Sequence, residues 1–147
     1  MHVLSHWRCS VRLTRQTDYA LRILLQAAAE PAERLSIAGV SAMHGISKNH
    51  VMKVVNLLAR NGLLATVRGR GGGFTLGRDA SDIRLGEVVR LTEPDLNPAD
   101  CDNCVLNGSC GLTPMLGSAV RAFLAELDRQ TLADAAKTSR ISHLIRG

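Results

Sequence analysis

From residue 14 onward the hydrophobic positions first follow the period of an α-helix. Apolar residues recur at i, i+3, i+4, i+7 and i+8, which places them on one face of an amphipathic helix. Thr14 or Thr17 can cap the first turn, and Pro31 ends the helix. Asp18 lies in that first turn, where a carboxylate is stabilised by the positive end of the helix dipole. The predicted buried stripe consists of Ala20, Ile23, Leu24, Ala27 and Ala28.

Two further helices are predicted between residues 35 and 62. Ser36 caps a short helix, Gly45 forms the turn after it, Ser47 caps a longer helix, and Gly62 ends that one. A short helix, a glycine turn and a longer helix form a helix-turn-helix. The amino-terminal end of the second helix, which usually meets base edges in the major groove, is polar. The candidate DNA-binding residues at that end are Ser47, Lys48, Asn49, His50 and Lys53.

The pattern then changes to the alternation of β-strands. Residues 64–67 and 74–76 alternate like the two strands of a hairpin, and a glycine-rich segment joins them. Arg68 and Arg70 in this segment are suited to phosphates or a narrow minor groove, and glycines such as Gly72 permit close approach to the DNA backbone. A nucleotide-binding loop is disfavoured because no Lys-Ser/Thr pair follows. A helix-turn-helix followed by a basic hairpin is a winged helix.

The remaining apolar positions predict one short and one long helix. Asp82 is expected to cap a short helix before Pro94, and Thr113-Pro114 to begin the long one. A terminal helix in a small winged-helix protein usually forms the seam of a symmetric dimer, although an intramolecular core helix is the alternative. The long helix has a stripe of Leu116, Ala119, Val120, Phe123 and Leu127, and Thr131 caps a final turn through Ala136.

The predicted fold is mainly α with a small β-hairpin wing: a winged helix-turn-helix with a long C-terminal dimerisation helix. The expected divisions are an N-terminal extension over 1–12, the DNA-binding domain over 13–93, a cysteine loop over 94–112, the dimerisation helix over 113–136 and a flexible tail over 137–147.

Composition and charge indicate the kind of partner and the cellular compartment to expect. The chain has 147 residues and is 46% hydrophobic but only 3% aromatic, so it can form one domain with an aliphatic core. Residues 1–93 carry a net charge of +6 and residues 94–147 a net charge of −1, which favours a polyanion partner for the first part only. No apolar run is long enough to span a bilayer, and the start lacks a signal-peptide pattern. We therefore expect a cytoplasmic protein with reduced thiols and no membrane association.

Three cysteines lie within ten residues, at the spacing CxxCx5C, and Gly108 and Gly111 give their loop conformational freedom. Converging thiolates bind soft metals or iron–sulfur clusters. Three thiolates leave a tetrahedral zinc site or a cubane cluster one ligand short. Of the three interpretations, an iron–sulfur cluster is favoured over zinc, and a redox-active disulfide comes after both. Cys9 is isolated, and no pattern of His or Asp around any cysteine indicates an activated nucleophile, so an enzyme is not expected.

Four segments together resemble the NsrR family of nitric-oxide-sensing iron–sulfur winged-helix repressors: residues 13–22, 45–53, 67–73 and 131–134. The resemblance implies a homodimeric repressor of nitrosative-stress genes that binds double-stranded DNA at a pseudo-palindromic operator. It also implies a [4Fe–4S] or [2Fe–2S] cluster, with nitric oxide as the signal that releases the operator. Carried over by position, the cluster thiolates are Cys101, Cys104 and Cys110, and Asp18 supplies an oxygen ligand from the partner subunit's first helix.

The chain departs from that family at two places. Only two residues separate Cys101 from Cys104, a shorter gap than is usual, and residues 1–10 precede the usual start of the family's chains. Two alternatives stay open: a regulator of iron–sulfur assembly or iron supply with the same fold, and a zinc-stabilised winged-helix binding module.

Overall fold

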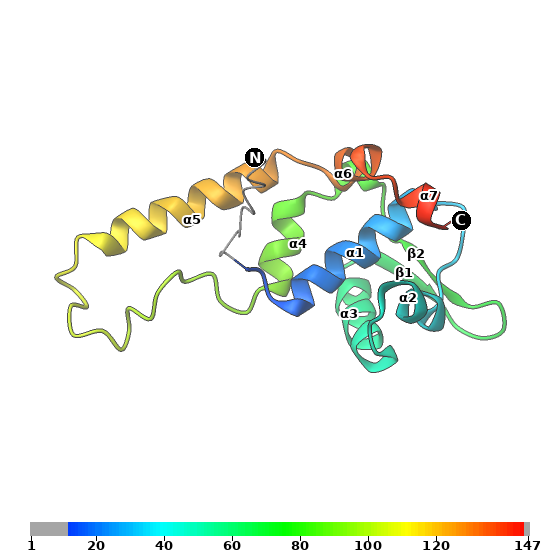
Figure 1. Ribbon diagram of the computed structural model, residues 1–147, viewed down its shortest axis with the longest axis horizontal. Coiled ribbons are helices and arrows are strands. Elements are labelled where there is room, and N and C mark those ends of the chain that lie inside the picture. Colours follow the sequence, from blue (N-terminus) through cyan, green and yellow to red (C-terminus); the bar gives the residue numbers. More distant parts are fainter. Residues whose placement is uncertain (1–11, 146–147) are drawn as a thin grey trace, which may run out of the picture.

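A computed structural model describes residues 12–145 and shows a mainly helical chain with one antiparallel hairpin (Figure 1). The predicted winged helix-turn-helix is confirmed. Of the predicted extension, residues 1–11 and with them Cys9 lie outside the described part. The elements are α1 (Arg15–Ala29), α2 (Ile37–His44), α3 (Lys48–Arg60), β1 (Leu64–Val67), β2 (Gly73–Leu76), the 3-10 helix η1 (Ala80–Asp82), α4 (Leu85–Thr92), α5 (Leu112–Asp128), α6 (Leu132–Thr138) and α7 (Ile141–Ile145).

The first three helices begin where the polar caps predicted. Thr14 Oγ1 accepts the backbone N–H of Thr17, and Ser36 and Ser47 cap α2 and α3 in the same way. Gly45 ends α2 with a φ of 64°, a left-handed conformation that glycine adopts without strain. The apolar stripes of α1 and α3 meet the hairpin and α4 in one aliphatic core. Its fully buried side chains include Ile23, Leu24, Val51, Leu58, Leu63, Phe74, Ile83, Val88 and Leu132.

The hairpin pairs Leu64 with Leu76 and Val67 with Gly73. Leu35, just before α2, forms an isolated antiparallel β-bridge with Phe74, in which the two residues exchange backbone hydrogen bonds of 2.9 Å. This pairing fixes the wing to the helix-turn-helix. It also explains Gly73, because a side chain there would collide with the carbonyl oxygen of Leu35.

The long C-terminal segment differs from the prediction. Instead of one helix over 113–136, α5 ends at Asp128, and α6 begins after Thr131 with a capping box in which Asp134 accepts the backbone N–H of Thr131. Helix α5 begins at Leu112, so Pro114 is its third residue rather than its first, a position that still needs no intrahelical N–H. It extends away from the core and has no buried residue (Figure 1).

Two smaller predictions are also corrected. Asp82 lies within η1 rather than capping α4, whose N-cap is Arg84 without a side-chain hydrogen bond. The chain after residue 137 was expected to be a loose tail, but α6 continues to Thr138 and α7 follows, and both pack against α1.

Candidate nucleic-acid interface and cysteine loop

The amino-terminal end of α3 presents polar groups to solvent. Lys48, Asn49, His50 and Lys53 are exposed, and so is the capping residue Ser47. The opposite face of the same helix is buried in the core through its valine and leucine stripe. The core therefore fixes which face of α3 remains free, and this is the face that the sequence predicted for base contacts.

A hollow of about 340 Å³ lies between this end of α3 and the start of α1. Arg15, Gln16 and Tyr19 of α1 line one side, and His50 and Lys53 of α3 line the other. The rings of Tyr19 and His50 lie 6.1 Å apart between centroids, tilted by 41°. The sequence analysis did not identify the three α1 residues, although two polar positions at the start of an otherwise amphipathic helix were the available signal. The hollow combines two long cations with hydrogen-bond donors, a composition suited to a phosphate.

The wing carries two further cations. Arg68 and Arg70 are exposed at the hairpin tip, which turns through Gly69 and Gly71 at φ values of 95° and 69°. Gly72 has no room for a side chain, because a Cβ would collide with the carbonyl oxygen of Val67. Figure 1 shows the wing at the end of the molecule opposite the far end of α5, with α2 between the wing and α3 in this view.

Arg34 is a second residue that the sequence analysis missed. Its Nη1 donates a 2.9 Å hydrogen bond to the carbonyl oxygen of Gly71, which connects the wing tip to the segment before α2. Arg34 therefore limits the positions that the wing can take relative to α3.

The cysteine loop joins α4 to the far end of α5. The Cys104 N–H donates to the Cys101 carbonyl oxygen at 3.2 Å, and Gly108 turns the chain back with a φ of 82°. Cys101 Sγ lies 3.9 Å from Thr113 Oγ1. The backbone N–H groups of Leu112 and Thr113 at the start of α5 lower the pKa of the Cys110 thiol. This lowering favours the thiolate form, which is the form that binds metals.

The three thiols do not converge in this conformation. Within residues 12–145, no group of three or more His, Cys, Asp or Glu side chains is arranged to hold a metal ion. Cys101 and Cys110 both adjoin Thr113, whereas Cys104 is exposed and its sulfur accepts the Leu106 N–H at 3.5 Å. The donor chemistry fits a thiolate-ligated iron–sulfur group, and the three sulfurs would have to come together around it.

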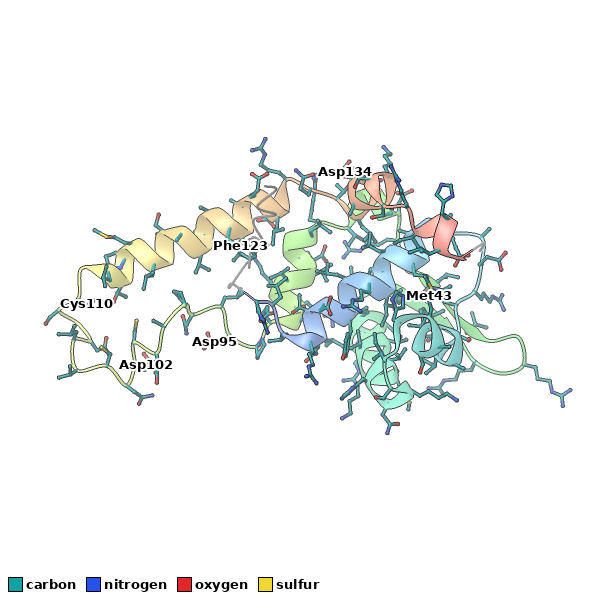
Figure 2. The ribbon with its side chains drawn as sticks, in the orientation of Figure 1. Met43, Asp95, Asp102, Cys110, Phe123 and Asp134 are labelled. Carbon is teal, nitrogen blue, oxygen red and sulfur yellow. The ribbon has the colours of Figure 1, made fainter. Side chains whose placement is uncertain are left out.

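Asp18 forms no metal-binding group with the loop cysteines of the same chain in the described part of the structure. Its carboxylate forms a two-pronged ion pair with Arg22, with oxygen–nitrogen distances of 2.7 and 2.9 Å. Figure 2 shows Cys110 and Asp102 at one end of the molecule and Met43, in the DNA-binding half, at the other. A ligand role for Asp18 would therefore require a second subunit and release of Arg22.

A hydrogen-bond network at Glu93 links the start of the loop to the start of α1. One oxygen of Glu93 accepts the Thr14 N–H at 2.7 Å, the Thr14 hydroxyl at 3.1 Å and the Thr17 hydroxyl at 2.6 Å. Thr92 Oγ1 lies 2.7 Å from Thr17 Oγ1 and 2.8 Å from the Val88 carbonyl oxygen, so its single proton can go to either. Glu93 thus anchors α1, on which Asp18 lies, to the point where the cysteine loop begins.

Comparison with known proteins decides the family. The sequence matches Rrf2, described as an iron-dependent transcriptional regulator, over residues 13–138. The chain belongs to the Rrf2 family. It is 47% identical over 133 residues to the HTH-type transcriptional regulator NsrR of Bacillus subtilis (strain 168), a match that covers 86% of this chain and 91% of that protein. The predicted resemblance to NsrR is confirmed, and these Rrf2 relatives are regulators rather than enzymes.

Solved structures show the same Rrf2 architecture. CymR (YrzC), the global cysteine regulator of B. subtilis, matches with a TM-score of 0.72 at 23% identity, over 88% of this chain and 98% of that chain. T. potens IscR matches with a TM-score of 0.72 at 22% identity, over 90% of this chain and 91% of that chain. At these identities the likeness shows the fold alone. Among the helices of residues 12–145, none has the length and apolar character to cross a bilayer.

Proposed function

We propose that this Rrf2 protein is a homodimeric, DNA-binding transcriptional repressor whose operator affinity is switched when nitric oxide reacts with an iron–sulfur cluster. The observation that carries the proposal is the set of exposed cations at the α3 end and the wing tip, beside a hollow between α1 and α3 that holds Arg15 and Lys53. The thiol-rich loop lies at the far end of a separate long helix. DNA binding and sensing are thereby assigned to different parts of one chain.

The DNA-binding roles follow from position and chemistry. The polar residues at the start of α3 reach base edges in the major groove, and the wing arginines contact phosphates or enter the minor groove. Arg15 and Tyr19 extend the phosphate contacts to the first helix. The assigned residues are Ser47, Lys48, Asn49, His50, Lys53, Arg68, Arg70 and Gly72, with Arg15 and Tyr19 added.

The dimer is supported by the unburied apolar surface of α5. Leu112 and Met115 are 61% and 68% exposed, and Phe123 remains 39% exposed although it faces the α4 side. Covering such a surface with the same helix of a second subunit yields a two-fold dimer, and a two-fold dimer matches a pseudo-palindromic operator.

The cysteine loop is the proposed sensor. Cys101, Cys104 and Cys110 would hold a [4Fe–4S] or [2Fe–2S] cluster, with Asp18 of the partner subunit as the oxygen ligand. A bound cluster would supply iron that nitric oxide can attack. The chain's own contribution is to favour a thiolate at Cys110 and, through Glu93, to connect the loop to α1.

Anaerobic purification followed by iron, sulfide and zinc analysis tests the sensor. A duplex-binding titration with and without nitric oxide then tests the switch. Replacing any of the three loop cysteines with serine should remove the iron–sulfur absorbance. A colourless, iron-free protein that still binds its operator normally would refute the cluster as the switch.

A salt titration tests the DNA-binding surface. Lys53→Ala, Arg68→Ala and Arg70→Ala should each weaken operator binding and reduce the salt slope by about one. Arg140→Ala removes an exposed cation that lies outside α3, the hollow and the wing, and is the matched control. Unchanged affinity in all three test variants would refute the assigned surface.

One further reading is favoured by the family's description as iron-dependent. In it, the same fold regulates iron supply or iron–sulfur assembly, and cluster occupancy itself is the signal. Iron depletion without nitric oxide would then release the operator as fully as nitric oxide does. A protein that contains zinc and has no visible absorbance would instead indicate a structural zinc module.

A further inference from the structure

Helices α4 and α5 diverge from a single packed corner. The C-terminal end of α5 lies against α4, and the chain after it is fixed there by two backbone hydrogen bonds, Leu85 N–H to the Gln130 carbonyl oxygen at 3.0 Å and Leu132 N–H to the Ile83 carbonyl oxygen at 2.8 Å. The other ends of the two helices are far apart, and the cysteine loop spans the distance (Figure 1). The direction of α5 is therefore set at this corner.

Three residues form the contact at the corner, which we call the α4–α5 junction: Gly86 and Arg90 of α4 and Asp128 of α5. Arg90 Nη1 donates to Asp128 Oδ1 at 2.6 Å, and Nη2 donates to Oδ2 at 2.7 Å. This forked geometry fixes the orientation of both side chains, unlike a single-point ion pair. Arg90 accordingly lowers the pKa of the Asp128 carboxyl.

Gly86 is the second, independent observation at the junction. It is buried one turn before Arg90, and a Cβ at this position would collide with Asp128 Oδ1. Gly86 is the second residue of α4 and its φ is not positive, so the local backbone conformation does not itself require glycine. The position of Asp128 supplies a reason, because a methyl group at residue 86 would displace the Asp128 carboxylate from its place beside Arg90.

The length of α5 amplifies any change at the junction. Seventeen residues of α-helix span about 25 Å, so a rotation of roughly 10° at one end moves the other end by about 4 Å. One base pair occupies about 3.4 Å along the DNA axis. In the proposed dimer the DNA-binding domains are attached to paired α5 helices, so a rotation at the junction also changes the distance between the two α3 helices.

We infer that Gly86, Arg90 and Asp128 are positioning residues that set the half-site spacing the dimer recognises. The inference rests on the proposed dimeric DNA-binding function and deepens it. None of the three residues lies in the cysteine loop, the hollow, α3 or the wing. They act only through the direction of α5 relative to the DNA-binding domain.

A series of operators tests the inference with the full chain, purified anaerobically. The distance between half-site centres is varied by one and two base pairs in each direction, and a single half-site is included. Asp128→Asn removes the charge at nearly constant size, Gly86→Ala places a methyl group where the Asp128 carboxylate lies, and Arg90→Lys keeps the charge without the fork. Glu126→Gln is the control, because it removes a 3.3 Å ion pair with Arg129 at the same end of α5 that does not reach α4.

Wild type and Glu126→Gln should prefer the best spacing by about tenfold or more over its neighbours. Asp128→Asn and Gly86→Ala should shift the optimum or reduce the preference to about threefold or less, with single half-site affinity unchanged. The spacing preference of Arg90→Lys should lie between that of wild type and that of Asp128→Asn. Spacing profiles identical to wild type in Asp128→Asn and Gly86→Ala would overturn the inference.

A DNA-free measurement separates this inference from the proposed function. Residual dipolar couplings of amide N–H groups report the orientation of α5 relative to α1 and α3. The orientation should match wild type in Glu126→Gln and differ in Gly86→Ala. An unchanged orientation overturns the role of the junction, whereas a changed orientation in a protein that binds no duplex overturns the proposed function alone.

Discussion

Glu93 offers the sharpest test of how the cysteine loop is joined to the DNA-binding domain. It follows α4 directly, and one carboxylate oxygen accepts hydrogen bonds from the Thr14 N–H and from the Thr14 and Thr17 hydroxyls. Thr17 is fully buried, and without Glu93 the nearest oxygens left to its hydroxyl are the neutral ones of Thr14 and Thr92. Glu93→Ala should therefore destabilise the protein far more than an ordinary surface substitution.

The expected magnitude follows from these contacts. A hydrogen bond to a charged group contributes about 1.5–3 kcal/mol, and leaving a buried donor unpaired costs about 1–3 kcal/mol. Because the three donors share one oxygen, their contributions do not add, and we expect Glu93→Ala to lower the free energy of unfolding by about 3 kcal/mol. For a chain of this size that corresponds to a fall in Tm of about 10 °C. Glu93→Gln keeps an acceptor without the charge, so a loss of about 1 kcal/mol is expected.

Urea unfolding of the cluster-free protein, followed by circular dichroism at neutral pH, measures the change. Glu87→Ala is the matched control: it makes the same substitution within α4, at an ion pair with Arg78 in which both side chains are more than a third exposed. Such a pair contributes about 1 kcal/mol or less. Equal destabilisation by Glu93→Ala and Glu87→Ala would show that the network does not anchor α1.

Three further predictions concern the wing and two titrating groups. Arg34→Ala removes the hydrogen bond to Gly71 and should weaken operator binding severalfold, in line with about 1 kcal/mol for one hydrogen bond, while the salt slope in a binding titration stays nearly unchanged. Burial lowers the pKa of His44, so the unfolded chain takes up a proton first and the free energy of unfolding should fall as pH drops from about 7 to 5; urea melts should show a flatter dependence in His44→Gln. The backbone N–H of Thr131 lowers the pKa of Asp134, so the stability from this cap is present at neutral pH and lost as pH falls below about 4. In Asp134→Asn, melts at pH 7 and pH 3 should differ less than in wild type.

The elements that the sequence predicted best are those that local chemistry specifies. Thr14, Ser36 and Ser47 cap their helices as expected, because a cap needs only a side-chain oxygen next to the helix start. The wing was predictable for a similar reason, since strand alternation on both sides of a glycine-rich turn is a local pattern. The division between α5 and α6 was not recognised, although Thr131 was identified as a cap. The division depends on α6 packing against α1, more than a hundred residues away.

The contacts that position the candidate site are the ones that the sequence could not predict. Glu93 and Thr17 are separated by 76 residues, and Arg90 and Asp128 by 38. Neither pair has a periodic signature, because each residue taken alone resembles an ordinary surface charge or a helix cap. The three cysteines were evident from their spacing, but whether their sulfurs converge depends on the path of an exposed loop, which spacing does not determine.

Helix α4 has a particular place in this arrangement because it is connected at both of its ends. The Glu93 network attaches its C-terminal end to α1, and the junction of Gly86, Arg90 and Asp128 attaches the rest of the helix to α5. The cysteine loop begins at Glu93 and ends where α5 begins, so its two ends are tied to the two elements that α4 connects. A change in the distance between the ends of the loop must therefore strain the Glu93 network, turn α5 at the junction, or both. Straining the Glu93 network moves α1 within one subunit, whereas turning α5 moves the two DNA-binding domains of a dimer relative to each other. Only in the second case should the loss of operator affinity vary with the half-site spacing of the operator.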